Sequence, residues 1–232
     1  MAEREIVLDT ETTGLSPELG DRVVEIGCVE LVNHVPTGKH FHRYINPECD
    51  MPADAFRVHG LSTEFLAGHK VFAEHIEEFL AFLGDARLII HNADFDLGFL
   101  NHELSRASHP KLSNKVTDTV ALARKKHPGA RASLDALCKH YGIDTSKRTL
   151  HGALLDAQIL AEVYLELIGG RQVRLELASV SAEAAVSAGS EVRGAAARPT
   201  PLSPRIGDAE IAAHEEFIAR LGKHAIWRKY SA

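Results

Sequence analysis

The stretch Ile6-Val7-Leu8-Asp9-Thr10-Glu11-Thr12-Thr13-Gly14 indicates both the fold class and the first candidate chemistry of the chain. Its apolar start predicts a buried strand, and the carboxylates Asp9 and Glu11 follow two residues apart at the end of that strand. Because side chains alternate along a strand, both carboxylates point to one side. Two such groups repel each other unless a hard cation lies between them, which indicates a Mg²⁺ or Mn²⁺ ligand pair. Taken alone, the Asp-x-Glu spacing is more typical of incidental acids at an exposed strand end.

The segments outside this stretch predict alternating layers of helix and strand. Apolar runs indicate further strands at 23–32, 40–45, 87–91 and near Val116. Periodic apolar positions and stop signals indicate helices at 72–83, 95–108, 119–126, 133–141 and 152–168. We therefore expect an α/β domain whose mixed central sheet contains a three-strand meander and two further strands, flanked by helices.

Length and composition are those of a globular protein. The chain has 232 residues, of which 45% are hydrophobic and 25% charged, enough for one ordinary domain with an appendage. No apolar run approaches a membrane span and no signal-peptide pattern begins the sequence, so we expect a cytoplasmic protein. Cys28, Cys49 and Cys138 are scattered without C-x-x-C spacing, which argues against disulfides and structural zinc.

The charge is unevenly distributed. The formal net charge is −6, yet the segment 111–150 contains nine basic residues and three acidic ones. A basic patch on an acidic protein suits a polyanion held beside carboxylate-bound metal. A solvated helical face explains the same pattern equally well.

Two more motifs bring polar groups to strand ends and helix starts. In His91-Asn92-Ala93-Asp94-Phe95-Asp96, carboxylates follow an apolar strand and enter a helix. In His151-Gly152-Ala153-Leu154-Leu155-Asp156, an imidazole and a carboxylate flank a helix start and are able to face one cleft. Together with Asp9 and Glu11, these residues supply acidic ligands for a two-metal centre and one imidazole that can take a proton from water, as phosphodiester hydrolysis requires.

The three motifs, in this order and spacing, resemble the DEDDh 3′→5′ exonucleases of the ribonuclease H-like fold over about residues 4–168. The resemblance implies that Asp9, Glu11, Asp96 and Asp156 hold two divalent cations and that His151 is the general base. The Asn-x-x-Phe-Asp frame selects Asp96 rather than Asp94 as the ligand.

Within that family, the segments 9–14, 58–60 and 89–92 are most similar to the proofreading (epsilon) subunits of bacterial DNA polymerase III. The resemblance implies a DNA 3′ end as substrate and release of nucleoside 5′-monophosphates. It implies substrate contacts from the catalytic residues Asp9, Glu11 and His151 and from five others, namely Thr13, Leu15, His59, Asn92 and Phe95. His59 capping its own loop and Phe95 packing in the core are the competing interpretations.

The resemblance and the composition together divide the chain into three parts. Residues 1–170 form the exonuclease domain, and 171–207, rich in Ala, Ser, Gly and Pro, form a flexible linker. Within it, 172–177 resembles the peptides that bind the sliding clamp (beta), with Gln172, Leu175 and Leu177 as anchors, although a frayed helix extension fits equally well. Residues 208–232 form a helical tail for the catalytic (alpha) subunit of the polymerase, with five apolar anchors, Ile211, Phe217, Ile218, Leu221 and Trp227. Some epsilon chains also bind a small accessory subunit.

Two alternatives remain open from the sequence. One is an RNA-trimming exonuclease, because the sugar pocket and not the metal site senses the 2′-hydroxyl. The other is a catalytically silent replication adaptor, which the presence of all five catalytic residue types argues against.

Overall fold

The computed structural model describes residues 3–146, 148, 150–169 and 206–222, which fall into two units. The first contains every strand and the helices α1 to α7, and the second contains α8 (Asp208–Arg220). In the part of the chain described, no helix is long and apolar enough to cross a membrane.

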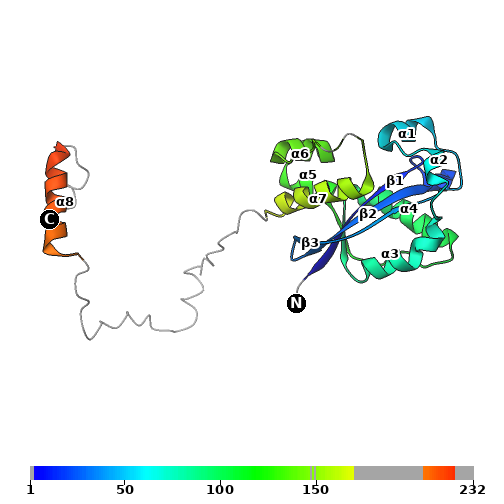
Figure 1. Cartoon of the computed structure of the whole chain (residues 1–232), viewed down its shortest axis with the longest axis horizontal. Helices are drawn as coiled ribbons and strands as arrows, with labels where there is room; N and C mark the ends of the chain where they lie inside the picture. The colour runs from blue at the N-terminus through cyan, green and yellow to red at the C-terminus, as the bar shows by residue number, and fades with distance from the viewer. Residues whose placement is uncertain (1–2, 147, 149, 170–205, 223–232) are drawn as a thin grey trace, which may run out of the picture. The chain divides into compact units, whose positions relative to one another are not determined.

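A five-stranded mixed sheet forms the centre of the first unit (Figure 1). Its order is β3-β2-β1-β4-β5, with β1–β2 and β2–β3 antiparallel and β1–β4 and β4–β5 parallel. This confirms the predicted meander with two further strands. The strands are β1 (Arg4–Thr12), β2 (Val23–Val32), β3 (Val35–Tyr44), β4 (Arg87–Ile90) and β5 (Val116–Asp118).

The helices agree with the predicted pattern except in two places. The helix predicted at 72–83 is divided into the 3-10 turn η2 (Phe72–His75) and α3, and two short helices, α1 and α2, were not predicted. The 3-10 turn η1 (Pro17–Leu19) follows β1. The helices of this unit are α1 (Ala53–His59), α2 (Thr63–Leu66), α3 (Ile76–Leu83), α4 (Ala93–Arg106), α5 (Thr119–Lys126), α6 (Leu134–Tyr141) and α7 (Ala153–Leu167).

Helices cover both faces of the sheet (Figure 1). On β1, Ile6 and Leu8 pack in a core with Phe79 of α3 and Phe99 of α4. Val7 points to the other face and packs against α7. The alternation of β1 thus divides the molecule into an α3/α4 side and an α7 side, as the period of a strand requires.

The strand that carries the first motif is longer than predicted. β1 continues to Thr12, so Asp9 and Glu11 lie within it and not beyond its end. Its parallel neighbour β4 stops earlier, because the last paired residues are Leu8 and Ile90. From Asp9 onward β1 pairs only with β2, which leaves its other edge open to side chains from the helices.

Gly27 of β2 sets the distance between the sheet and α7. It pairs with Asp9, and a Cβ added to it would lie 2.2 Å from the backbone of Ala153 and Leu154. We predict that Gly27→Ala costs at least about 2 kcal/mol of stability and lowers activity, because α7 must move away and takes Asp156 with it. Gly98→Ala in α4 is the matched control, because no atom of the described residues lies within 4 Å of a Cβ added there, and it should leave the melting temperature unchanged or raised. Wild-type stability of Gly27→Ala would contradict this account.

Candidate active site

Three of the predicted residues meet on the α7 side of the sheet. Glu11 of β1, Asp156 of α7 and His151, which precedes α7, each offer a ligand atom within 4.8 Å of the other two. Both carboxylates are buried, whereas the His151 side chain is about half exposed. The centre is therefore accessible to solvent at His151, whereas Glu11 and Asp156 are shielded from solvent.

Asp96 approaches from the opposite side of the sheet. It lies in the first turn of α4, is only 2% exposed, and accepts a hydrogen bond of 2.7 Å from Thr10 Oγ1. Thr10 faces away from Glu11 on the same strand, so Asp96 reaches β1 along the edge that β4 leaves open. Asp94, its neighbour in the motif, is exposed.

Glu25 is a fifth carboxylate that the sequence interpretation missed. It is 4% exposed, lies directly opposite Glu11 on β2, and its Oε1 is 2.7 Å from His42 Nε2. Its charge contributes to the raised pKa of both Asp9 and Glu11. No spacing rule identifies it, because its position depends on the register between two strands joined by a ten-residue connection.

Burial raises the pKa of three acids in this centre, and repulsion by neighbouring charges adds to the shift of two of them. Burial first, and then the charges of its neighbours, raise the pKa of Asp9 well above its usual range and that of Glu11 to about 8. Burial raises the pKa of Asp96 to about 7, against the hydrogen bond from Thr10. Carboxylates held together at such a cost are the oxygen donors that hard divalent cations prefer, so Asp9, Glu11, Asp96 and Asp156 fit the metal pair that the family implies.

One cation of the protein itself is present among these acids. The Arg148 guanidinium donates to both oxygens of Asp156, at 2.6 and 2.7 Å, and also contacts Asp135 of α6. In the sequence, Arg148 stood out only as part of the basic segment 111–150. Its position three residues before His151 was the available signal.

The predicted contacts beside β1 differ in exposure. Thr13 is buried, and its hydroxyl accepts a hydrogen bond from the Arg22 N–H at 2.9 Å and lies near Asp21. Leu15 is 85% exposed, and Leu19, at the end of η1, is similarly exposed. Leu15 is thus free to contact a ligand, whereas the Thr13 side chain holds its own loop together.

The other predicted contacts lie at two helix ends. Nδ1 of His59, at the end of α1, accepts from the Leu61 N–H at 3.1 Å, while its buried Nε2 has no hydrogen-bond partner among the described residues. The Asn92 side chain is exposed at the start of α4, with its backbone in the left-handed region. Phe95 is half-buried against Phe99, with ring centroids 5.0 Å apart, so the core-packing interpretation describes at least part of its role.

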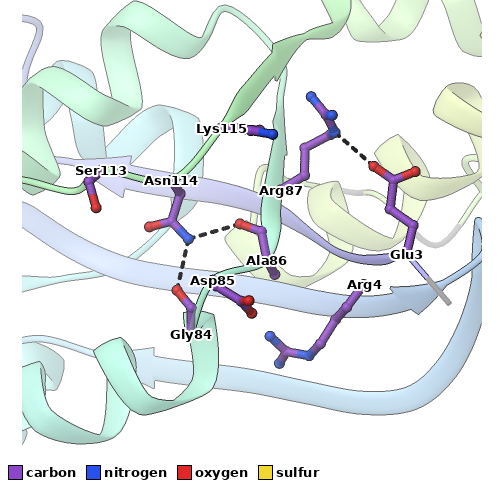
Figure 2. A pocket seen from close by; sticks show the side chains of 9 residues that line it. All are labelled: Glu3, Arg4, Gly84, Asp85, Ala86, Arg87, Ser113, Asn114 and Lys115. Carbon is purple, nitrogen blue, oxygen red and sulfur yellow. Dashed lines mark hydrogen bonds and ion pairs between the residues drawn. The ribbon is translucent and has the colours of Figure 1, made fainter. Parts of the chain in front are cut away.

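Figure 2 shows a polar hollow lined by residues such as Arg4 and Arg87. These residues begin β1 and β4, whereas Asp9 and Glu11 lie toward the other end of β1. The polar groups of the hollow are largely satisfied internally: Arg87 pairs with Glu3 at 3.1 Å, and the Asn114 amide donates to the carbonyls of Gly84 and Ala86. Arg4 pairs with Glu30. The hollow contains two acids, Glu3 and Asp85, and Glu3 is paired with Arg87, so it does not gather several carboxylates as the centre around Asp9 does.

The raised pKa values predict how the stability of the metal-free protein depends on pH. The ordinary pKa of Glu11 is 4.5 and its folded value is about 8, so the folded protein retains a proton that the unfolded chain loses. This contribution to stability is complete below pH 4 and is lost as pH rises toward 8. Between pH 6.5 and 8.5 we expect the melting temperature in EDTA to fall by about 5 °C. Glu11→Gln should reduce this dependence, leaving the part that Asp9 and Asp96 contribute, and an equal fall in that variant would assign the whole effect to other groups.

Only some of the residues predicted to act in the C-terminal part lie within the described structure. In α8, Ile211, Phe217 and Leu221 at its end are exposed, and Ile218 is partly so. Trp227 and the clamp-like residues Gln172, Leu175 and Leu177 lie outside the described residues, as does nearly all of 171–207. The proposed division of the chain and the partner contacts stay predictions.

Comparison with known proteins identifies the family. Residues 6–164 match the family RNase_T, described as Exonuclease. DNA polymerase III subunit epsilon of Rickettsia felis is 48% identical over 227 residues, covering 96% of this chain and 98% of the relative. The Escherichia coli K12 protein of the same name is 44% identical over 245 residues, covering 97% of each chain.

Solved structures agree on the fold. The nuclease domain of 3′hExo, a DEDDh family member, bound to rAMP, is 18% identical with a TM-score of 0.64, covering 73% of this chain and 93% of that one. Exonuclease X in complex with 5′ overhanging duplex DNA is 24% identical with a TM-score of 0.56, covering 72% and 92%. The predicted ribonuclease H-like exonuclease fold is thereby confirmed, and the chain is an exonuclease that belongs to the DNA polymerase III epsilon-subunit family.

Proposed function

We propose that this protein removes nucleotides from DNA 3′ ends, as the proofreading exonuclease of a replicative polymerase, with two Mg²⁺ or Mn²⁺ ions held by Asp9, Glu11, Asp96 and Asp156. The observation that carries the proposal is the convergence of these four carboxylates and His151 at one edge of β1 from both faces of the sheet. When bound, the two cations supply an activated water and neutralise charge on the scissile phosphate.

His151 is suited to move the proton of the attacking water. Its Nδ1 lies 3.1 Å from Asp156 Oδ2, so an Nδ1–H group can donate a hydrogen bond to that carboxylate. Nε2 then carries the free lone pair and can accept a proton from water. The half-exposed position of His151 lets the proton leave to solvent afterwards.

His59 and Leu15 are suited to hold the terminal nucleotide. A buried, unpartnered nitrogen such as His59 Nε2 costs free energy unless a ligand or water completes its hydrogen bond. His59 ends α1, and the Val58 carbonyl accepts from the His151 N–H at 3.1 Å, which ties α1 to the catalytic loop. Leu15 offers an exposed apolar surface beside the same strand end.

The proposal is tested with oligonucleotides labelled at one end. Digestion of a 5′-labelled DNA strand should give a ladder that shortens from the 3′ end, with nucleoside 5′-monophosphates as product, in Mg²⁺ or Mn²⁺ and not in EDTA. Matched RNA tests the RNA-trimming alternative, because efficient RNA digestion with little DNA digestion would favour it. Absence of hydrolysis in both metals would favour the silent adaptor.

The partners are proposed from the relatives and from α8. The names of the relatives place them in DNA polymerase III, and the exposed Ile211, Phe217 and Leu221 give α8 an apolar surface suited to the catalytic subunit. Replacing Phe217 and Leu221 by Ser should abolish co-purification with that subunit and leave hydrolysis of short oligonucleotides unchanged. Replacing Gln172, Leu175 and Leu177 by Ala should likewise abolish only sliding-clamp binding. The small accessory subunit is proposed from the family resemblance alone.

A further inference from the structure

The guanidinium of Arg148 makes the contacts that a cation would make at Asp156. Its Nε and Nη2 donate to Oδ1 and Oδ2 at 2.6 and 2.7 Å, which is the bidentate fork that arginine forms with carboxylates. The side chain is only 10% exposed, so little water screens the pair. Within the described residues, it is the one arginine or lysine paired with an acid of this centre, where the histidines His42 and His151 contact Glu25 and Asp156.

The same guanidinium also contacts His151. Nη2 lies 2.8 Å from His151 Nδ1, and that nitrogen is 3.1 Å from Asp156 Oδ2. Nδ1 has either a proton or a lone pair, so it can donate to Asp156 or accept from Arg148 but cannot do both. Since Nη2 has only protons to offer, its 2.8 Å contact with Nδ1 is a hydrogen bond only when the imidazole proton is on Nε2. In that tautomer, Nε2 has no lone pair with which to accept a proton from water.

We propose that Arg148 is a latch that closes the metal-free centre, by occupying Asp156 and holding His151 in the tautomer that cannot act as base, and that a divalent cation opens it. The inference rests on the proposed metal role of Asp156. If Asp156 held a cation, its oxygens would no longer be available to the Arg148 fork. Nδ1 would then carry the imidazole proton and donate a hydrogen bond to Asp156. This would leave the lone pair of Nε2 available to accept a proton from water.

Asp135 is a second carboxylate partner, which Arg148 can keep when it releases Asp156. It lies in the first turn of α6, is mostly exposed, and contacts Nη1 of Arg148, the nitrogen that Asp156 does not use. Arg148 can therefore leave Asp156 without losing every charged partner. The positive charge of Arg148 offsets the repulsion between the carboxylates when no metal is bound. It also keeps His151 from acting as a base until the metal binds.

The first experiment measures Mn²⁺ binding to the full chain by calorimetry. If Arg148 competes with metal, Arg148→Gln should lower the Mn²⁺ dissociation constant about tenfold, the scale of one charge-assisted hydrogen-bonded pair. Arg131→Gln is the control, since it removes the same positive charge from an exposed position near α6. It should leave the Mn²⁺ dissociation constant within about twofold of the wild-type value. Arg148→Lys retains the charge but not the fork, so it should also bind more tightly than wild type.

The outcomes separate the latch from the proposed function. No Mn²⁺ binding by the wild type would overturn the metal role itself. If the wild type binds Mn²⁺ but Arg148→Gln binds it equally well or more weakly, the latch alone would be overturned. An arginine that merely orients Asp156 would help metal to bind. If Arg148→Lys had the wild-type Mn²⁺ dissociation constant, the tighter binding of Arg148→Gln would come from the lost charge and not from the lost fork. That result would also overturn the latch.

A second measurement needs no variant. Nitrogen-15 NMR of histidine-labelled wild type at pH 8 distinguishes the two neutral tautomers of His151. We expect the Nε2–H form in EDTA and the Nδ1–H form after Mg²⁺ is added. The Nδ1–H form already present in EDTA would contradict the proposed contact between Arg148 and Nδ1.

Discussion

Asp96→Asn is expected to lower exonuclease turnover on the order of a thousandfold while the metal-free protein stays folded. Asparagine has nearly the size of aspartate, and its amide oxygen can still accept the hydrogen bond from Thr10 Oγ1. The substitution removes one negative charge from a centre whose acids raise the pKa of Asp9. Lost activity without lost stability would therefore reflect the metal role of Asp96. Single-turnover hydrolysis of a 5′-labelled oligonucleotide and a melting curve in EDTA measure the two quantities.

Asp94→Asn supplies the matched control for this prediction. Asp94 lies in the same first turn of α4, two residues earlier, but its side chain is exposed. Its replacement changes the net charge and the helix start equally and should change turnover by less than about threefold. If both variants lost activity alike, the loss would come from the charge near the helix start. If Asp94→Asn alone lost activity, the choice of Asp96 from the sequence frame would be wrong.

The sheet was predictable because its strands have strong local signals. Ile6 to Leu8 is an uninterrupted apolar run, and the segments at 23–32 and 87–91 have similar patterns. The helix α1 was not predictable in the same way. Its residues Ala53–His59 make under two turns and are mostly exposed, so no apolar stripe identifies them. A helix this short owes its stability to tertiary contacts, such as the hydrogen bond from the His151 N–H to the Val58 carbonyl.

The candidate site was predictable where residues follow strands and helices in sequence, and not where spatial neighbours decide. Asp9 and Glu11 share a side because of strand alternation, which is a local rule. Glu25 joins them only through the register of β1 and β2, which no local pattern fixes. Arg148 joins them from a loop, where side-chain direction depends on the partners that the fold provides. The charge of the segment 111–150 suggested a polyanion site, whereas Arg148 within it contacts the acids of the protein itself.

His151→Ala is expected to lower turnover by about a hundredfold to ten-thousandfold at pH 8, the range found when a general base is removed. The side chain is about half exposed, so its loss should cost little stability. The four carboxylates remain, so the Mn²⁺ dissociation constant should change by only a few-fold. His140→Ala, an exposed histidine of α6, is the control and should retain wild-type turnover.

The pH profile of this variant distinguishes a lost base from a distorted site. Without an imidazole to take the proton, the attacking water depends on hydroxide from solvent, so the residual rate of His151→Ala should rise tenfold per pH unit between pH 7 and 9. A site distorted by the substitution would show a low rate without that slope. Near-wild-type turnover would transfer the role of base from His151 to solvent or to another group, and it would leave Arg148 with no base to restrain.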